Sequence, residues 1–174
     1  MKRTTALIAL IAVMLATASC GLFHDEKKEA ARSYETFLKA VSERNCGEIW
    51  NSMAYESQRQ YESFIYKPSM DRVRMVSPEN KKMLFPGTKV SIESMERMTP
   101  KEFFEFQLTN TGLIKDIESC FPVGRKVESV EIAGDSATLK MESVHDKNVS
   151  DKIPMRMENG RWRIVFFPPG DIKR

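Results

Sequence analysis

Three cysteines are the residues whose chemistry can best be inferred from their positions in this chain: Cys20, Cys46 and Cys120. A thiol can be acylated, can form a disulfide, or can lie buried as a small apolar side chain. Cys20 follows an apolar run that ends in small residues, in the stretch VMLATASCGLF. The other two lie well inside the chain, so the three thiols call for separate interpretations.

The first 19 residues have the layout of a secretory signal peptide. Lys2 and Arg3 form a basic start, an almost uninterrupted apolar run extends from Ala6 to Ala16, and Thr17, Ala18 and Ser19 are small. The apolar run is shorter than the roughly 20 residues that a membrane-spanning helix needs. We therefore expect a targeting segment rather than a permanent transmembrane anchor.

The stretch LATASC resembles a bacterial lipobox, in which small residues precede a cysteine that is acylated and becomes the first residue. Ala18 and Ser19 match that pattern, whereas Thr17 stands where an aliphatic residue is usual. The resemblance implies that residues 1–19 are removed, that Cys20 carries the lipid, and that residues 20–25 form a tether. It also implies a periplasm-facing position in the cell envelope. Since Gly21 rather than Asp follows the cysteine, the outer membrane is favoured. A plain cleaved signal peptide or an uncleaved leader is the alternative.

Cys46 and Cys120 can pair only with each other if Cys20 is acylated. Disulfides persist in the oxidising compartments outside the inner membrane. Closing so long a loop contributes roughly 4 kcal/mol on the chain-entropy model. The alternative is two separate buried thiols, and the compartment favours the disulfide.

No catalytic motif is readable from the sequence. Asp71, Asp116 and Tyr34 are residues of a type that could serve as a base or an acid, but none lies in a recognisable constellation. His24 and His145 lack partners at the spacing of a hydrolase triad or a zinc site, and there is no glycine-rich phosphate loop. The eleven methionines suit Cu(I) chemically, but their scatter favours core filling. We expect no enzyme activity, no metal and no cofactor.

The charge balance excludes one class of partner. The chain has 27 Lys and Arg residues against 24 Asp and Glu residues, without a concentrated basic segment. Nucleic-acid-binding domains usually present a strongly basic face. We therefore expect no nucleic acid among the partners.

Helical periodicity dominates the first part of the chain. Apolar residues at helical spacing predict an amphipathic helix over residues 26–44, and Asn45 with Glu48 predicts the start of a second one. The stretch from Tyr55 to Tyr66 is also typical of a helix, which Pro68 is expected to stop.

The middle of the chain has weaker signals. The segment DRVRMV is compatible with a helix end or a strand, PENKKMLFPG with a loop that contains a helical turn, and KVSIESMERM with a strand. In TPKEFFEFQL, Thr99, Pro100 and Glu102 predict a capped helix start. We expect that helix to run past Gly112 toward Ile117.

From Val127 onward the pattern changes to alternation. Two pairs of strands are expected, with turns at Gly134-Asp135 and Asn159-Gly160. Helices followed by an antiparallel meander predict an α+β class, with N-terminal helices packed on a curved antiparallel sheet. The prediction is a single domain over residues 26–168, followed by a tail at 169–174.

The helices FLKAVSERN and CGEIWNSM, with the strands VESVEIAGDSATLKM and IPMRMENGRWRIV, resemble the nuclear transport factor 2-like superfamily. They are especially similar to small bacterial lipoproteins of that fold. The resemblance covers most of residues 26–168 and implies a cone, in which a bent sheet wraps around helices and often leaves an apolar pocket. The superfamily includes isomerases and dehydratases as well as non-catalytic binding domains.

Aromatic side chains on these elements are the candidates for lining such a pocket, and the alternative is that they simply fill the core. They are Tyr34, Trp50, Phe103, Phe106 and Trp162. On the last strand Arg161 and Arg163 share one face, which we interpret as the solvated side or as a contact for an acidic partner or lipid headgroups.

We therefore expect a non-catalytic envelope lipoprotein that is tethered by its lipid and binds a partner protein or a small apolar ligand. An isomerase-type or dehydratase-type enzyme with a buried carboxylate in the cone is the rival hypothesis. A homodimer or docking onto an envelope complex is the third.

Overall fold

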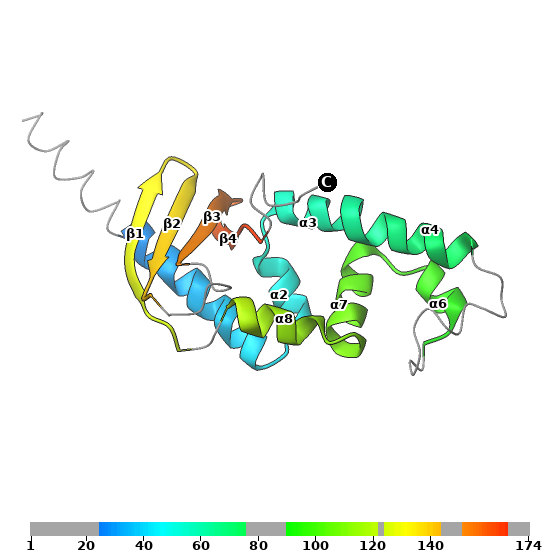
Figure 1. Ribbon diagram of the computed structural model, residues 1–174. Helices are drawn as coiled ribbons and strands as arrows, with labels where there is room; N and C mark the ends of the chain where they lie inside the picture. The colour runs from blue at the N-terminus through cyan, green and yellow to red at the C-terminus, as the bar shows by residue number, and fades with distance from the viewer. Residues whose placement is uncertain (1–24, 76–89, 122–123, 144–150, 167–174) are drawn as a thin grey trace, which may run out of the picture.

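The computed structural model describes residues 25–75, 90–121, 124–143 and 151–166. Helices come first along the chain and an antiparallel sheet follows, so the predicted α+β class is confirmed. The sheet is open and the molecule is elongated. The strands lie at one end, and α4 and α6 lie at the other (Figure 1).

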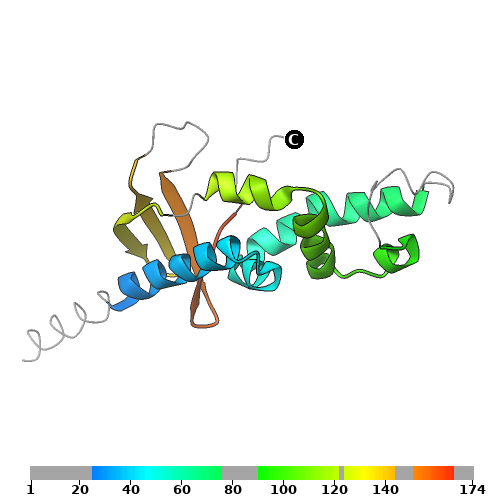
Figure 2. The same cartoon turned by 90° about the horizontal axis from the view of Figure 1, so that it is seen from below.

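An N-terminal helix over residues 25–42 lies along the sheet, as Figures 1 and 2 both show. It ends where Arg44 takes a positive φ of 54° and the Asn45 backbone N–H donates to the Ala40 carbonyl at 2.8 Å. The helix α2 (Cys46–Ser52) follows at once, and the Asn45 side chain accepts from the Glu48 backbone N–H. Both helices match the sequence prediction, because their caps are local.

The predicted stop at Pro68 is wrong. Helix α3 (Tyr55–Tyr61) continues through the π-helical η1 (Glu62–Tyr66) into α4 (Lys67–Met75), and we call this continuous element the long helix. In η1 the Lys67 backbone N–H donates five residues back, to the Glu62 carbonyl. This wider turn directly precedes Pro68, which donates no hydrogen bond and whose ring needs space near the Phe64 carbonyl. The segment DRVRM is therefore helical.

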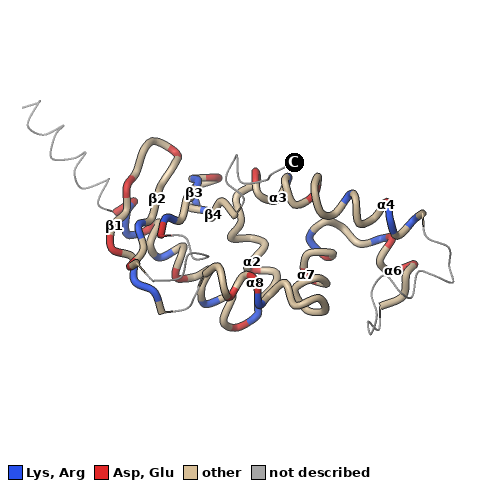
Figure 3. The backbone as a smooth tube through the Cα atoms, viewed as in Figure 1, with Lys and Arg blue, Asp and Glu red and all other residues tan. Residues whose placement is uncertain are grey.

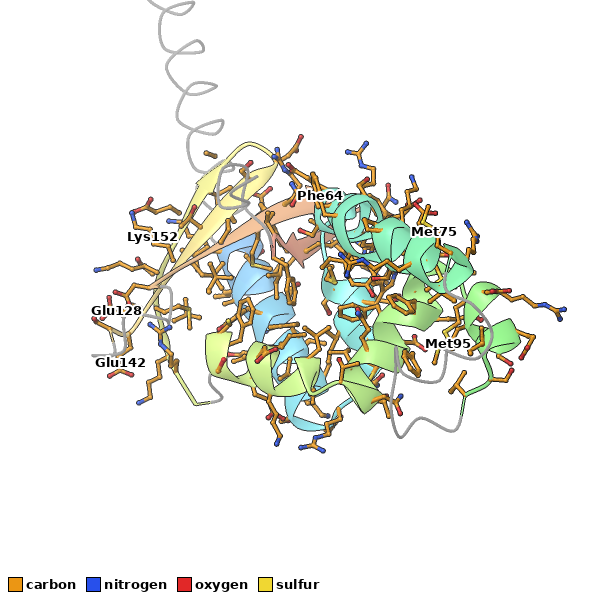
Figure 4. All side chains as sticks on the ribbon, turned by 45° about the vertical axis from the view of Figure 1, so that its right-hand side comes forward. Phe64, Met75, Met95, Glu128, Glu142 and Lys152 are labelled. Atoms are coloured by element: carbon orange, nitrogen blue, oxygen red, sulfur yellow. The ribbon has the colours of Figure 1, made fainter. Side chains whose placement is uncertain are left out.

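The predicted strand in KVSIESMERM is also wrong. The structure has α6 (Ile92–Glu96), and the Ser91 side chain accepts from the Ser94 backbone N–H to cap it. Met95 is buried at 1 % exposure beneath the long helix (Figure 4). Apolar and polar residues alternate over this short segment by coincidence, and the burial of Met95 favours the helix over a strand. The PENKKMLFPG loop lies outside the described residues.

Helix α7 (Pro100–Asn110) begins with the predicted capping box between Thr99 and Glu102. It does not run past Gly112 as expected. Gly112 takes a φ of 82° and starts a separate helix, α8 (Leu113–Cys120). A left-handed residue breaks the hydrogen-bond ladder, and glycine adopts that conformation at little steric cost.

The sheet is a simple meander with strands in the order β1 (Val127–Ala133), β2 (Ser136–Met141), β3 (Lys152–Glu158) and β4 (Arg161–Ile164). Asn159 and Gly160 have φ values of 52° and 72°, and Glu158 pairs with Arg161 across them. Two positive φ values are what a tight hairpin with the twist of the sheet requires. Both predicted hairpins are confirmed.

One connected core joins the sheet to the helices. The sheet supplies mostly aliphatic and methionine side chains, and the helices supply most of the aromatic ones. The largest fully buried side chains are Tyr34, Tyr61, Phe37, Phe103, Ile49, Met53, Met70, Met95, Leu108, Leu139, Met141 and Met155. Five methionines stand in that set, which confirms that methionine fills the core.

Candidate functional site

A surface groove of about 630 Å³ lies where α2, α3 and the start of α7 meet. We call it the α2–α7 groove. Three separate elements shape it, so it is a product of the tertiary fold. Its lining consists of Trp50, Tyr55, Gln58, Arg59, Glu62, Thr99, Pro100 and Lys101.

Trp50 lines the α2–α7 groove and is held in place by two buried aromatic side chains behind it. Trp50, Tyr61 and Phe104 form a triangle with ring centroids 5.2 to 5.6 Å apart, in edge-to-face and tilted arrangements. The Gln58 Nε2 amide donates to the Trp50 carbonyl at 2.9 Å and to the Met53 carbonyl at 3.3 Å, which ties α3 to the end of α2. The Tyr61 hydroxyl donates to Gln107 Oε1 at 2.6 Å. An apolar occupant would therefore meet a preformed surface.

The rim of the groove carries two cations with different environments. Arg59 is exposed and forms no ion pair with any other described residue. The Lys101 Nζ lies 3.4 Å from Asn51 Oδ1 and 4.0 Å from Glu105 Oε1. Glu62 is paired with Lys67 at 3.4 Å. Arg59 is thus the group that is most available to a carboxylate arriving from outside.

The start of α7 forms the far wall. The Thr99 backbone N–H and its hydroxyl both donate to Glu102 Oε2, at 2.7 and 2.8 Å. These two hydrogen bonds hold the pKa of Glu102 below its ordinary value, since they favour the ionised carboxylate. The wall beside Pro100 is therefore fixed by a complete capping box.

Residues of β3, β4 and the turn between them contact Tyr55 at the start of α3. Glu158 accepts from the Tyr55 backbone N–H at 2.9 Å, and the Arg163 guanidinium lies 4.8 Å from the Tyr55 ring centroid. Asn159 Nδ2 donates to the Tyr55 hydroxyl at 2.9 Å. Arg163 also pairs with Glu158, and it donates to the Asn51 carbonyl. The interpretation of Arg163 as solvated is therefore wrong, because its side chain is only 15 % exposed.

A second hollow of about 550 Å³ lies between the N-terminal helix and β1. Tyr34 and Leu38 give it an apolar side, and Lys27, Lys28 and Lys126 lie at its rim. Burial raises the pKa of the Tyr34 phenol to about 12, partly offset by the Arg125 guanidinium, so the phenol is neutral at physiological pH. Arg125 itself pairs with Asp151 at 2.9 Å.

The five aromatic residues expected to line one pocket are separated in the structure. Trp50 reaches the α2–α7 groove and Tyr34 reaches the second hollow. Phe103, Phe106 and Trp162 are core residues, with exposed fractions of 0, 6 and 4 %. Sequence reasoning missed Tyr55, Arg59 and Lys101, because nothing local in the sequence shows that α3 and α7 approach each other.

The candidate carboxylates do not form a catalytic pair. Asp71 lies exposed on α4 with Arg74 3.7 Å away, and Asp116 lies exposed in the first turn of α8. Within the described ranges no Asp or Glu is buried, and Ser57 is the one buried polar residue. The described residues also contain no group of three metal-ligating side chains. His24 and His145 lie outside them, as does Cys20.

The predicted disulfide is not present, since Cys46 and Cys120 are free thiols. The Cys46 Sγ donates to the Arg44 carbonyl at 3.4 Å within its own turn, and Cys120 is exposed at the end of α8. An ion pair at 3.8 Å instead joins Arg44, in the turn before α2, to Glu118 of α8.

Comparisons with protein-family models, with curated proteins and with solved structures return no match to this chain. Among the helices that the structure describes, none has the length and apolar character needed to cross a membrane.

Proposed function

We propose that this protein is a membrane-tethered envelope lipoprotein whose α+β domain binds a partner protein without catalysing a reaction. The observation that carries the binding function is the α2–α7 groove, in which Trp50 is held by buried aromatic rings and Arg59 at the rim forms no ion pair with another described residue. Partner-binding sites characteristically combine a buried aromatic anchor with a polar rim. The absence of buried carboxylates among the described residues also favours binding over the isomerase-type or dehydratase-type rival.

The groove suits an extended segment better than an enclosed small molecule. It is open to solvent, and its apolar floor is flanked by Arg59 on one wall and Lys101 on the other. We infer that its occupant is a peptide segment with an apolar side chain next to a carboxylate. A small apolar ligand alone would leave Arg59 without a counter-charge among the described residues.

The tether is the second part of the proposal. Acylation of Cys20 would contribute roughly 0.8 kcal/mol of membrane affinity for each buried methylene, so two or three chains anchor a protein durably. Incorporation of radioactive palmitate into the full chain, and its loss in Cys20→Ala, tests this. A labelled Cys20→Ala protein would contradict Cys20 as the acylation site.

The fold itself supports a finer proposal. The features that support it are an N-terminal helix, a short second helix and a closing antiparallel meander, which are separated in this chain by the helices from α3 to α8. We propose that the domain is an open variant of that cone, whose core is filled by side chains such as Phe103 and Trp162.

The binding function is tested with a photo-crosslinking amino acid at Arg59 in cells that produce the full chain, with Lys115 on α8 as the matched exposed control position. We expect a discrete crosslinked protein from position 59 only, identified by mass spectrometry. Lys101→Glu should weaken this crosslink, since it reverses the second cation of the rim. Equal crosslinking at both positions would contradict a specific groove. A small molecule that copurifies and is displaced by the Lys101→Glu change would favour the ligand hypothesis instead.

A further inference from the structure

The outer face of the long helix carries large apolar side chains that are exposed to solvent. Three large apolar residues of the described chain are exposed, Tyr55 at 42 %, Phe64 at 55 % and Met75 at 85 %, and all three lie on this one helix. Tyr55 is accounted for by its contact with Arg163. Phe64 and Met75 have no such partner on the sheet.

Phe64 and Met75 belong to one stripe. Phe64, Pro68, Asp71 and Met75 are spaced by four, three and four residues, which places them along one side of a helix. All four are exposed, while Met70 and Val73 on the other side are buried in the core. We call these four residues the outer stripe. Figure 4 shows Phe64 and Met75 at the upper surface, above the side chains that fill the interior.

Cations flank the outer stripe. Lys67, Arg72 and Arg74 lie on α4, whose one carboxylate is Asp71. Asp71 pairs with Arg74 at 3.7 Å and Lys67 pairs with Glu62 at 3.4 Å, all with largely exposed side chains. Arg72 is exposed and forms no ion pair with a described residue. An apolar line with basic flanks is the pattern by which helices lie in the interface of an anionic bilayer. Elsewhere the two signs of charge are interspersed (Figure 3).

The proposed anchor brings the bilayer to the same side of the molecule. Four residues lie between Cys20 and the start of the N-terminal helix at residue 25, so a fully extended tether of five Cα–Cα steps reaches at most about 18 Å. In Figures 1 and 4, which share a vertical axis, the start of that helix and the long helix both lie toward the upper side, whereas α8 lies toward the lower side. The anchor and the outer stripe therefore face the same side of the molecule, the anchor at the sheet end and the stripe toward the α4 end (Figure 1).

We propose that the outer stripe rests on the anionic membrane surface, with Phe64 and Met75 inserted among the lipids and Arg72 against their headgroups. This inference rests on the proposed lipid anchor. It assigns an orientation to the domain, with its long axis along the membrane. The convex shape of a single helix face favours a lipid surface over a protein groove, as does the excess of three cations on α4 over its one carboxylate, Asp71, which Arg74 neutralises.

The test uses the full chain purified from membranes and reconstituted in vesicles of phosphatidylcholine and phosphatidylglycerol with brominated acyl chains. Phe64→Trp and Met75→Trp are compared with Ser119→Trp, an exposed position on α8. After subtraction of the signal from Trp50 and Trp162, we expect at least about twofold more quenching at positions 64 and 75 than at 119. Arg72→Glu should reduce the quenching in Phe64→Trp, and Lys115→Glu should not.

The outcomes separate the two levels of the proposal. The mass of the purified chain shows whether it is acylated before any vesicle is made. An unacylated chain overturns the anchor and this orientation together. An acylated chain with equal quenching at all three positions overturns the orientation alone. Crosslinking of position 64 to a protein, without quenching by lipid, would assign the stripe to a protein partner and would also overturn the inference.

Discussion

The sheet and the long helix differ in how closely their local sequence matches their structure. In the sheet, Asn159 and Gly160 take the positive φ values that a tight turn needs, and the strands alternate as predicted. In the long helix, Pro68 lies inside a continuous helical element, whose hydrogen bonds widen to the π-helical pattern in η1 just before the proline. Two turn residues determine where a hairpin forms. Whether a helix continues through a proline depends on what the helix packs against.

The two regions also hold different interiors. The sheet side of the core relies on Leu139, Met141 and Met155, while the helical side relies on aromatic contacts such as Tyr66 with Phe103 at 5.8 Å. The cluster of Tyr55, Glu158 and Arg163 joins them. We therefore expect the two regions to unfold together.

The largest effect on stability is expected from truncating one fully buried side chain in each region. Phe103→Ala in the helices and Leu139→Ala in the sheet both replace side chains with 0 % exposure. Each should lower the free energy of unfolding by about 3 to 5 kcal/mol, from lost burial and the cavity left behind. Urea unfolding, followed by tryptophan fluorescence and by far-UV circular dichroism, should show a single transition in both variants. Two separated transitions would mean that the regions are independent.

Replacing one glycine in the sheet and one in the helices should have smaller effects on stability, of opposite sign. Gly160→Ala in the β3–β4 turn places a Cβ at a φ of 72° and should cost about 1 to 2 kcal/mol of stability. Gly47→Ala in α2 is the matched control, since its Cβ would meet Glu105 Oε1 at an ordinary 3.4 Å. That change should stabilise by about 0.5 to 1 kcal/mol, because alanine favours helix. Thermal unfolding measures both, and a stabilising Gly160→Ala would contradict the turn geometry.

Removing the cap of α7 tests the groove wall. Thr99→Ala should cost about 1 kcal/mol through the lost N-cap. Because the folded pKa of Glu102 is lowered, its contribution is present above pH 4.5 and is lost as the pH falls through the folded value. Thr99→Ala removes the hydroxyl hydrogen bond and keeps the backbone one, so it should flatten the acid limb of stability against pH in part. An acid limb that is as steep as in the parent protein would contradict this role.

The smallest effect concerns the contact that joins the two regions. A double-mutant cycle of Tyr55→Leu and Arg163→Met should give a coupling of about 0.5 to 1 kcal/mol, as a cation–π contact provides. Arg161→Met, on the same strand but exposed, is the control and should not couple to Tyr55. Urea denaturation of the four proteins measures it, and zero coupling would make the contact incidental.

Much of the fold could be predicted because its signals are local. The caps at Asn45 and Thr99 and the turn at Asn159-Gly160 each depend on a few neighbouring residues, and they determined where elements begin and end. The errors lie where local signals were weak or opposed to packing, at Pro68 and around Met95. At position 112 the sequence shows a glycine, but it does not show that this residue takes a positive φ and separates two helices.

The sequence by itself determined the elements with strong local chemistry, the α+β class and the residues from which a tether and a core could be built. Only the tertiary structure decided which aromatic side chains reach the surface. It separated Trp50 from Phe103 and Trp162, brought Arg59 of α3 opposite Lys101 of α7, and left Phe64 and Met75 outside. A groove depends on distances between elements remote in sequence, and no local pattern encodes those distances.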